Sequence, residues 1–396
     1  MKVPGIETAK IEKDLAFSVA EYKQRLAACR RHMAKKNLDV LVVTTPENIF
    51  YLSGYQTPGY YTSQCLIVPM TGEPVHISRG IEETNVWMLS WIERSESYMD
   101  HTDPMELFAE ILKKDGFAKG RIGIEKIGWF FSIANFERLK PLLPQADFQD
   151  GSMIVEACRV VKSEAEIAYI REAARCAEAG MRAALRTIRP GVTEANVAAE
   201  VQKAMTDMAS EYPGLPNFIC SGVRASQTHA TWTKRVLQDG DPMFMELSGC
   251  IRRYSAGLLR SATVGKSPEK RKKIWDVSSR ALDNMIAAIR PGRPLGEVWE
   301  AWVKTLEAAG HEGRFKRAGY SIGINFPPDW GEGYILCFKR GETRLLEPNM
   351  TFHIPSNVMI FGYAHTANSE TVRVTETGAE VLTNFPRKLF DCPVDV

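Results

Sequence analysis

Glu246 has the residue type and the setting of a catalytic carboxylate. It lies within Met243–Leu247, a strand-like run in which every second side chain points to the same face. A carboxylate enclosed on that face could attack an electron-poor carbon and form a covalent intermediate that water then resolves. The alternative is a salt bridge with one of the nearby arginines, which are Arg252, Arg253 and Arg260.

His229 is the candidate acid or base. It lies in the run Ser226–Trp232, and an imidazole titrates near neutral pH, as proton transfer requires. A histidine hydrogen-bonded within a loop is the competing interpretation. Glu370 begins a second strand-like run and could orient a water, although an exposed strand glutamate is the ordinary case. Glu246, His229 and Glu370 form the predicted catalytic set.

A proline-rich turn is the candidate binding element. Its run Pro-Pro-Asp-Trp-Gly-Glu carries Asp329, Trp330 and Glu332, and the two prolines lower the entropy lost when the turn orders around a ligand. Trp330 could stack on a delocalised cation, or it could be the packed residue of a structural turn. Tyr320 and His353 are further candidates. Tyr320 could equally be a hydrogen-bonded core residue, and for His353 the core or hydrogen-bonded interpretation is the favoured one.

Strands and helices of a second domain must position these residues. A capping box formed by Ser163 and Glu166 opens a long amphipathic helix that ends near Ile188. The turn Ile188–Gly191 has the sequence Ile-Arg-Pro-Gly, which recurs 101 residues later at Ile289–Gly292, between helical patterns in both places. This repeat predicts a duplicated unit with a site at its seam. The alternative is two unrelated helix pairs that share a glycine stop signal.

Strand patterns dominate the chain after His229, which predicts helices on one face of a curved antiparallel sheet. They are Pro242–Leu247, Tyr254–Val264, Asn349–Pro355 and Glu370–Val374. The first part of the chain instead alternates helices and strands, which predicts a small α/β domain with a largely parallel or mixed sheet. Its helices are Glu21–Lys36 and Met105–Lys114, and its strands are Asp39–Thr44, Cys65–Pro69, Val75–Ser78 and Arg121–Glu125.

The composition excludes several classes of protein. A chain of 396 residues exceeds one ordinary core, and 50 basic against 48 acidic residues give a net charge of +2. That balance provides no field for holding nucleic acid or an anionic membrane. No apolar run is long enough for a membrane helix, and residues 1–16 lack the apolar segment of a secretion signal. The eight cysteines form no CxxC pair, which favours a reduced cytoplasmic protein.

Six stretches, in their order along the chain, resemble the creatinase, Xaa-Pro aminopeptidase and methionine aminopeptidase superfamily (peptidase family M24). They are Asn48–Gly54, Val161–Ile167, the two Arg-Pro-Gly turns, Glu347–Phe352 and Thr377–Thr383. The resemblance implies an α+β fold. Residues 1–160 would form a smaller creatinase-like N-terminal α/β domain. Residues 161–396 would form the pita-bread catalytic domain with its internal pseudo-twofold repeat.

The resemblance also bears on metal binding, because peptidases of this superfamily hold two metal ions on five side chains. The matching positions here are Leu247, Gly257, Tyr320, Ile354 or Pro355, and Ser369. Shifting the match by one residue brings Glu246 and Glu370 to ligand positions, but it supplies no further ligand. Two carboxylates do not make a dinuclear site. We therefore expect a metal-independent member of the superfamily that uses no cofactor.

Within the superfamily, the ectoine hydrolases are the most similar group. The similar runs are Glu246–Tyr254, Gly319–Gly323, Pro327–Glu332 and Met350–His353. The departures are the loop after Tyr55, Thr228 and Ser255. Creatine is disfavoured as a substrate, since Leu259 stands where creatinase has a glutamate and the second creatinase glutamate is also missing.

The resemblance implies a hydrolase that opens a C–N bond in ectoine or a close relative, with Glu246 facing the amidinium. The implied substrate contacts are Tyr254, Tyr320, Asp329, Trp330, Glu332 and His353. Tyr60 and Tyr61 would close a partner's site in a homodimer, or else pack within their own subunit. The alternatives are a metal-dependent Xaa-Pro peptidase, a metal-free lyase acting on a betaine-like acid, and a non-catalytic binding protein.

Overall fold

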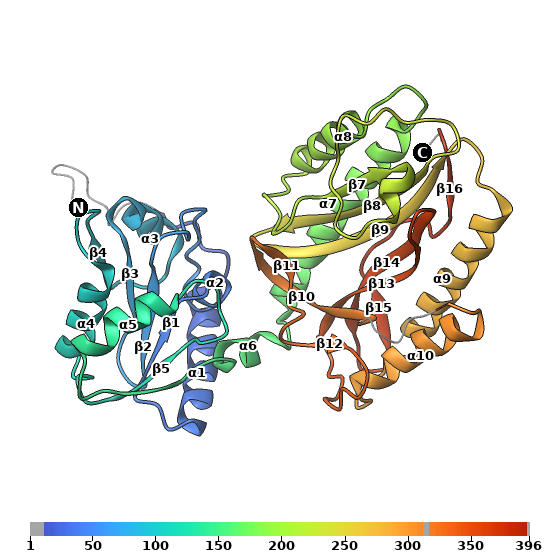
Figure 1. Cartoon of the computed structure of the whole chain (residues 1–396). Helices are drawn as coiled ribbons and strands as arrows, with labels where there is room; N and C mark the ends of the chain where they lie inside the picture. Colours follow the sequence, from blue (N-terminus) through green and yellow to red (C-terminus); the bar gives the residue numbers. More distant parts are fainter. Residues whose placement is uncertain (1–11, 312–316, 394–396) are drawn as a thin grey trace. The chain divides into compact units, whose positions relative to one another are not determined.

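The computed structural model describes residues 12–311 and 317–393. The chain divides into two compact units, one ending at Arg159 and the other beginning at Val160. Each unit has its own sheet and its own apolar core, as the two separate sets of strands in Figure 1 show.

The N-terminal unit is built on a mixed sheet of six strands in the order β4-β3-β2-β1-β5-β6. Strand β1 pairs antiparallel with β2 and parallel with β5, which confirms the predicted α/β architecture. The strands are β1 Val40–Val43, β2 Cys65–Pro69, β3 Val75–Arg79, β4 Ser95–Tyr98, β5 Arg121–Ile124 and β6 Asp147–Asp150. The helices are α1 Val19–Lys35, α2 Pro46–Ser53, α3 Glu83–Leu89, α4 Pro104–Lys114, α5 Ile133–Leu142 and α6 Ile154–Arg159.

The C-terminal unit is built on a ten-stranded sheet with the path β15-β14-β13-β10-β9-β8-β7, to which β11, β12 and β16 attach. The strands are β7 Phe218–Ser221, β8 Pro242–Ile251, β9 Tyr254–Val264, β10 Gly319–Phe326, β11 Asp329–Gly331, β12 Cys337–Phe338, β13 Thr351–Ile360, β14 Ala364–Val374, β15 Ala379–Val381 and β16 Phe390–Cys392. The helices are α7 Glu164–Thr187, α8 Glu194–Asp207, α9 Glu269–Ala288 and α10 Leu295–Ala308.

One motif occurs twice in this unit, as the repeat predicted. Helix α7 packs on the hairpin β8–β9 and α9 packs on the hairpin β13–β14, while α8 and α10 lie against α7 and α9 (Figure 1). In the turns that join the helices of each pair, Gly191 has φ of +87° and Gly292 has φ of +77°. A side chain is strained in that left-handed region, so the turns require glycine. The predicted capping box of Ser163 and Glu166 is present at the start of α7.

The hairpin β13–β14 is longer than predicted. Strand β13 continues to Ile360 and β14 begins at Ala364, whereas the sequence pattern ended one strand at Pro355 and began the other at Glu370. A proline inside a run usually marks the end of a strand, because it has no N–H to donate to a neighbour. Here the pairing with β14 continues on both sides of Pro355.

Alternation gives the C-terminal sheet two different faces. Met243, Met245 and Leu247 of β8 pack into the core under α7 and α8. Phe244 of the same strand belongs instead to a second cluster on the opposite face, away from those helices. The members of this second cluster include Phe218, Leu259, Tyr320, Trp330 and Ala367. Most of the predicted site residues are found around it.

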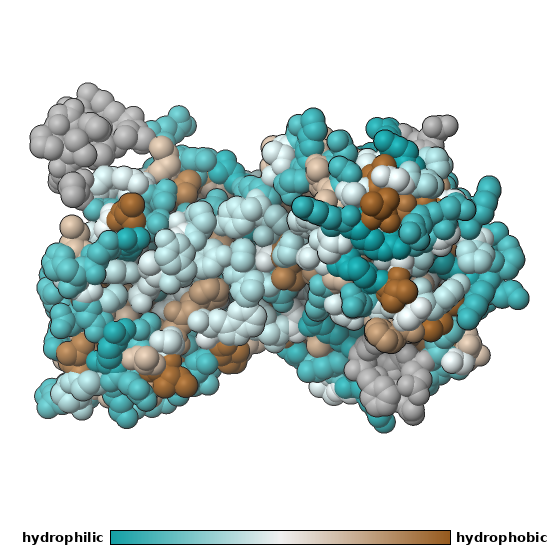
Figure 2. Space-filling model, turned by 45° about the horizontal axis from the view of Figure 1, so that its top comes forward, coloured by the Kyte–Doolittle hydropathy of each residue, from teal (hydrophilic) through white to brown (hydrophobic). Residues whose placement is uncertain are grey.

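The face of the molecule seen in Figure 2 is largely hydrophilic. Figure 2 shows apolar side chains only in small separate areas of the visible face. All eight cysteines are free thiols, and seven of them are buried. Among residues 12–311 and 317–393, no helix has the combination of length and apolar character that a bilayer crossing needs.

Candidate active site

Glu246 points to the face of the sheet that carries the second cluster. It pairs with Phe218 across β7–β8 and with Leu259 across β8–β9, and both neighbours belong to that cluster. Only 12% of its side chain is exposed, and within the described residues no hydrogen bond reaches its carboxylate. Burial raises the pKa of Glu246 from its ordinary 4.5 to about 7. The carboxylate is therefore available to a ligand and titrates close to neutral pH.

His353 of β13 lies against Tyr320 of the cluster. Its Nδ1 lies 2.9 Å from the hydroxyl of Tyr320 and its Nε2 lies 2.7 Å from the hydroxyl of Ser369. The same Nδ1 is 4.0 Å from Glu246 Oε1. Burial, assisted by the charge of Arg317, lowers the pKa of His353 to about 3. The imidazole is therefore neutral at physiological pH, and its approach to Glu246 is not an ion pair.

Two further donors hold the hydroxyls beside His353. The indole Nε1 of Trp330 donates to Tyr320 at 2.9 Å, and the backbone N–H of Leu259 donates to Ser369 at 2.7 Å. Each hydroxyl thus already accepts one hydrogen bond and can either donate to or accept from the imidazole. Both tautomers of His353 satisfy the network, so a proton can shift across the ring without any change in position.

Gly257 of β9 makes room for the imidazole. A Cβ at this position would lie 2.9 Å from Cδ2, Cε1 and Nε2 of His353, closer than such atoms approach in proteins. Among the five strand positions that the family resemblance singled out, the structure places Gly257, Tyr320 and Ser369 around this ring. At the other two positions a neighbouring residue faces the cluster instead. Glu246 does so in place of Leu247, which packs under α7, and His353 does so in place of Ile354 or Pro355.

His229 lies at the solvent-exposed edge of the cluster. Its backbone has φ of +56°, and its ring stacks on Phe218 with centroids 5.2 Å apart. Phe218 in turn contacts Trp330, with ring centroids 5.3 Å apart. Asp329 precedes Trp330 in β11, where burial raises the pKa of its carboxyl group. His229 and Asp329 therefore border the same apolar surface as Glu246.

A buried glutamate anchors the loop that carries His229. Glu194, at the start of α8, accepts hydrogen bonds from the backbone N–H groups of Ser221 and Thr233, each at 2.8 Å. It also accepts from the hydroxyls of the same two residues and from Arg224. Both ends of the segment between β7 and Thr233 are thus tied to one side chain. Glu194 carries no functional signal in the sequence, since a glutamate at the start of a helix is common.

Two predicted residues have their partners on the helix-covered face of the sheet. Glu370 points to the helix-covered face, where it accepts a 2.8 Å hydrogen bond from the buried Arg260 and another from Thr383. The hydroxyl of Tyr254 donates to Glu166 of α7 at 2.7 Å, on that same face. Side chains alternate along a strand, so Glu370 points to the opposite face from Ser369, and Tyr254 to the opposite face from Gly257. The expected placement of Glu370 and Tyr254 beside Glu246 is therefore wrong.

Glu332 is also turned away from the site. It forms a fully buried ion pair with Lys162 at 2.7 Å and accepts from Ser321 at 3.1 Å. The pair holds the end of the β10–β11 hairpin, so Glu332 supports the turn rather than displaying a charge. Ser255 has a similar role, because its hydroxyl donates to the carbonyl of Trp330 at 2.8 Å.

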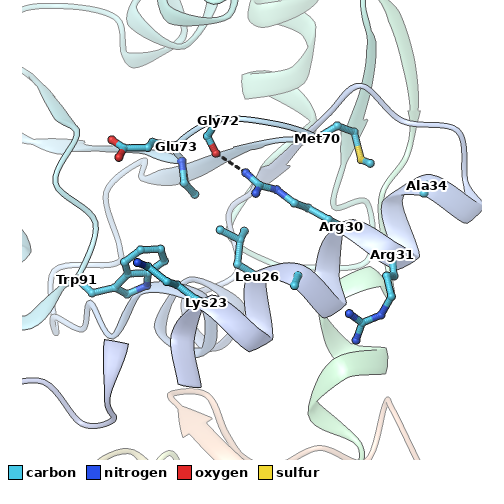
Figure 3. A pocket seen from close by; sticks show the side chains of 11 residues that line it. Lys23, Leu26, Arg30, Arg31, Ala34, Met70, Gly72, Glu73 and Trp91 are labelled. Carbon is cyan, nitrogen blue, oxygen red and sulfur yellow. Dashed lines mark hydrogen bonds between the residues drawn. The ribbon is translucent and has the colours of Figure 1, made fainter. Parts of the chain in front are cut away.

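Tyr60 and Tyr61 belong to the N-terminal unit. The ring of Tyr60 packs edge-on against Phe130 of the same unit at 5.5 Å, whereas Tyr61 is 79% exposed. Thr57 donates to Glu82 at 2.6 Å and so holds the loop that precedes them. This unit also has an open groove of about 600 Å³ along α1 (Figure 3). Its Arg30 is bonded to two backbone carbonyls, and no predicted site residue lines the groove.

Comparison with known proteins agrees with this architecture. Residues 168–378 match the model of metallopeptidase family M24, and residues 25–161 match the creatinase/prolidase N-terminal domain. An ectoine hydrolase of Halomonas elongata is 30% identical, over 96% of this chain and 99% of its own. An uncharacterized hydrolase/peptidase of Sinorhizobium fredii is 33% identical, over 95% and 98%. The crystal structure of dipeptidase PepE from Mycobacterium ulcerans has a TM-score of 0.80 at 23% identity, over 94% of this chain and 98% of that one.

The donor set of the cluster does not fit the metal pair that the name metallopeptidase implies. Within the part of the chain that the structure describes, no group of three or more His, Cys, Asp or Glu side chains is arranged so that it could hold a metal ion. The face around His353 offers one carboxylate, from Glu246, and the imidazole itself, whose nitrogens are both occupied by hydroxyls, while Asp329 and His229 lie at the border of the cluster. Gly257 contributes no donor at all. Two divalent ions need several hard oxygen ligands to bridge them.

Proposed function

The chain belongs to metallopeptidase family M24, whose members are hydrolases, and from that premise we propose that it is a metal-independent hydrolase. It opens a C–N bond in a small cyclic amidine, with ectoine or a near relative as the substrate. The observation that carries the proposal is the pair of Glu246 and His353, a raised-pKa carboxylate 4.0 Å from a neutral imidazole. The similarity to an ectoine hydrolase over nearly the whole chain supports the choice of substrate.

In this proposal Glu246 is the nucleophile. An amidinium beside the carboxylate favours its ionised form and so offsets the burial that raises its pKa. An oxygen of Glu246 then bonds to the amidine carbon, and the electron pair of the C=N bond moves to nitrogen. Water adds to the same carbon as the carboxylate leaves and gives up one proton to His229, and one ring C–N bond breaks once its nitrogen has taken that proton from His229. One water is consumed, and an amide and an amine are produced on one open chain.

The two histidines have different roles in this scheme. His353 is buried and neutral, so it positions Tyr320 and Ser369 and does not change its charge during the reaction. His229 is exposed and stacked on Phe218, beside the strand that carries Glu246. It is therefore the group that gives a proton to the departing nitrogen. Glu370 is left out of the catalytic set because Arg260 occupies its carboxylate.

The test is ring opening of ectoine by protein dialysed against EDTA, followed by proton NMR. We expect turnover that added Mn²⁺ does not change, and a loss of roughly 10³-fold or more in Glu246→Gln. Glu376→Gln is the matched control, since Glu376 is an exposed glutamate outside the site. Wild-type protein that is inert with and without Mn²⁺ would contradict the substrate. Activity that appears only with Mn²⁺ would favour the metal-dependent peptidase, and an unsaturated product would favour the lyase.

We also propose that the protein is a cytoplasmic homodimer in which Tyr60 and Tyr61 reach the site of the partner subunit. The eight free cysteines support a reducing compartment, and the exposure of Tyr61 supports a contact outside its own unit. Light scattering should give twice the chain mass, and Tyr61→Ala should raise the KM without changing that mass. A fully active monomer would contradict this assembly.

A further inference from the structure

Arg317 extends over the aromatic ring of a site residue. It lies two positions before β10, is exposed, and places its guanidinium carbon 4.5 Å from the ring centroid of Tyr320. Gly333 leaves the space that this guanidinium fills, since a Cβ there would collide with Nη1 of Arg317. A cation stacked on a tyrosine ring is held mainly by the electrostatics of that ring. The position of the guanidinium is therefore defined, although it is solvent-accessible.

The guanidinium makes no other polar contact within the described residues. Arg253 and Arg260, two other arginines near the cluster, donate hydrogen bonds to carbonyl or carboxylate oxygens. No acidic side chain or carbonyl pairs with Arg317 in this way, so its N–H donors are available to a ligand. Its charge nevertheless reaches the site, because it lowers the pKa of His353 and acts in the same direction on Asp329 and Tyr320.

Tyr320 and His353 lie between this cation and the carboxylate of Glu246. Arg317 lies over the ring of Tyr320, while the hydroxyl of Tyr320 contacts His353 at 2.9 Å, and His353 lies 4.0 Å from Glu246. The site thus has a positive end and a negative end on one apolar surface. A small zwitterion with an amidinium at one end and a carboxylate at the other matches that arrangement. Arginine suits a carboxylate, since its planar N–H groups can donate to both oxygens.

We propose that Arg317 binds the carboxylate of the substrate and thereby restricts the enzyme to cyclic amidines that carry a carboxylate. This inference rests on the proposed function, because it concerns the same site. It assigns the role of recognition to a residue outside the catalytic set. A charged hydrogen-bonded pair of this kind corresponds to about 10- to 100-fold in affinity.

The test compares wild type, Arg317→Gln and Arg317→Lys on ectoine and on its carboxamide. For ectoine we expect Arg317→Gln to raise the KM by about 10- to 100-fold with little change in kcat, and Arg317→Lys to fall between the two. The carboxamide should be a poor substrate of wild type, and Arg317→Gln should not raise the KM for the carboxamide further. Arg340→Gln, at an exposed arginine elsewhere in this unit, is the matched control. Equal KM values for wild type and Arg317→Gln would overturn the proposal.

A second measurement separates this proposal from the identity of the reaction. Pipecolate is a six-membered cyclic amino acid without an amidine, and pipecolamide lacks its carboxylate. By titration calorimetry, wild type should bind pipecolate at least about tenfold more tightly than pipecolamide, and Arg317→Gln should lose the difference. This holds whether or not ectoine is hydrolysed. No difference between the two compounds in wild type, including a failure of both to bind, would overturn the role of Arg317.

Discussion

Replacing Glu246 by glutamine should stabilise the protein at alkaline pH while it abolishes activity. The carboxylate is enclosed on the cluster face of β8, and burial raises its pKa to about 7 without a compensating hydrogen bond within the described residues. Glutamine has nearly the same shape and does not ionise. The substitution therefore removes the cost of a buried charge and changes the packing very little.

The magnitude follows from the shift in pKa. The folded protein holds the Glu246 proton up to about pH 7, whereas the unfolded chain releases it near 4.5. Between these values the folded state binds more protons, so the stability of wild type falls as the pH rises through this window. Each pKa unit corresponds to about 1.36 kcal/mol, which gives an upper limit of about 3 kcal/mol. The 12% exposure of the side chain reduces that figure through solvation.

The assay is urea unfolding of wild type and Glu246→Gln in parallel at pH 5, 6, 7 and 8, which cancels the titration of all shared groups. The free energy of unfolding of Glu246→Gln should equal that of wild type near pH 5 and exceed it increasingly toward pH 8. Glu376→Gln should show no such trend. A pH-independent difference would refute the burial argument. A variant that is less stable at pH 8 would show that Glu246 is instead paired with a nearby arginine.

Three further results are expected. The kcat/KM of wild type should rise with pH through about 7, since only the ionised form of Glu246 attacks, and a flat profile from pH 6 to 8 would contradict this. Gly257→Ala should destabilise the protein by about 1–3 kcal/mol in thermal unfolding, because its Cβ meets the ring of His353 at 2.9 Å. His353→Ala should relieve part of that cost, so additive effects would argue against the contact. Glu194→Gln should place an amide N–H against the N–H groups that Glu194 now accepts from, and so release the loop that carries His229. Cleavage of this loop by protease and the KM should both rise. Unchanged proteolysis would contradict the anchoring role.

The sequence by itself determined the architecture. The capping box of Ser163 and Glu166, the apolar stripe behind it and the two Arg-Pro-Gly turns are local signals, because their hydrogen bonds and φ angles are satisfied within a few residues. Alternation along the strand also allowed Glu246 to point to the interior of the C-terminal unit. The family followed from the order of its motifs, and the matches to the family models confirm it.

Tertiary structure alone decided which residues accompany Glu246. A shift of one residue moves every side chain of a strand to the other face, so the sequence did not separate Glu246 from Leu247. Pairing across the sheet made that choice, and it also removed Glu370, whose partner Arg260 lies 110 residues away in the chain. Arg317 carried no sequence signal, since a surface arginine is ordinary until a tyrosine ring lies beneath it. Such contacts join strands that are distant in sequence, and only the folded sheet brings them together.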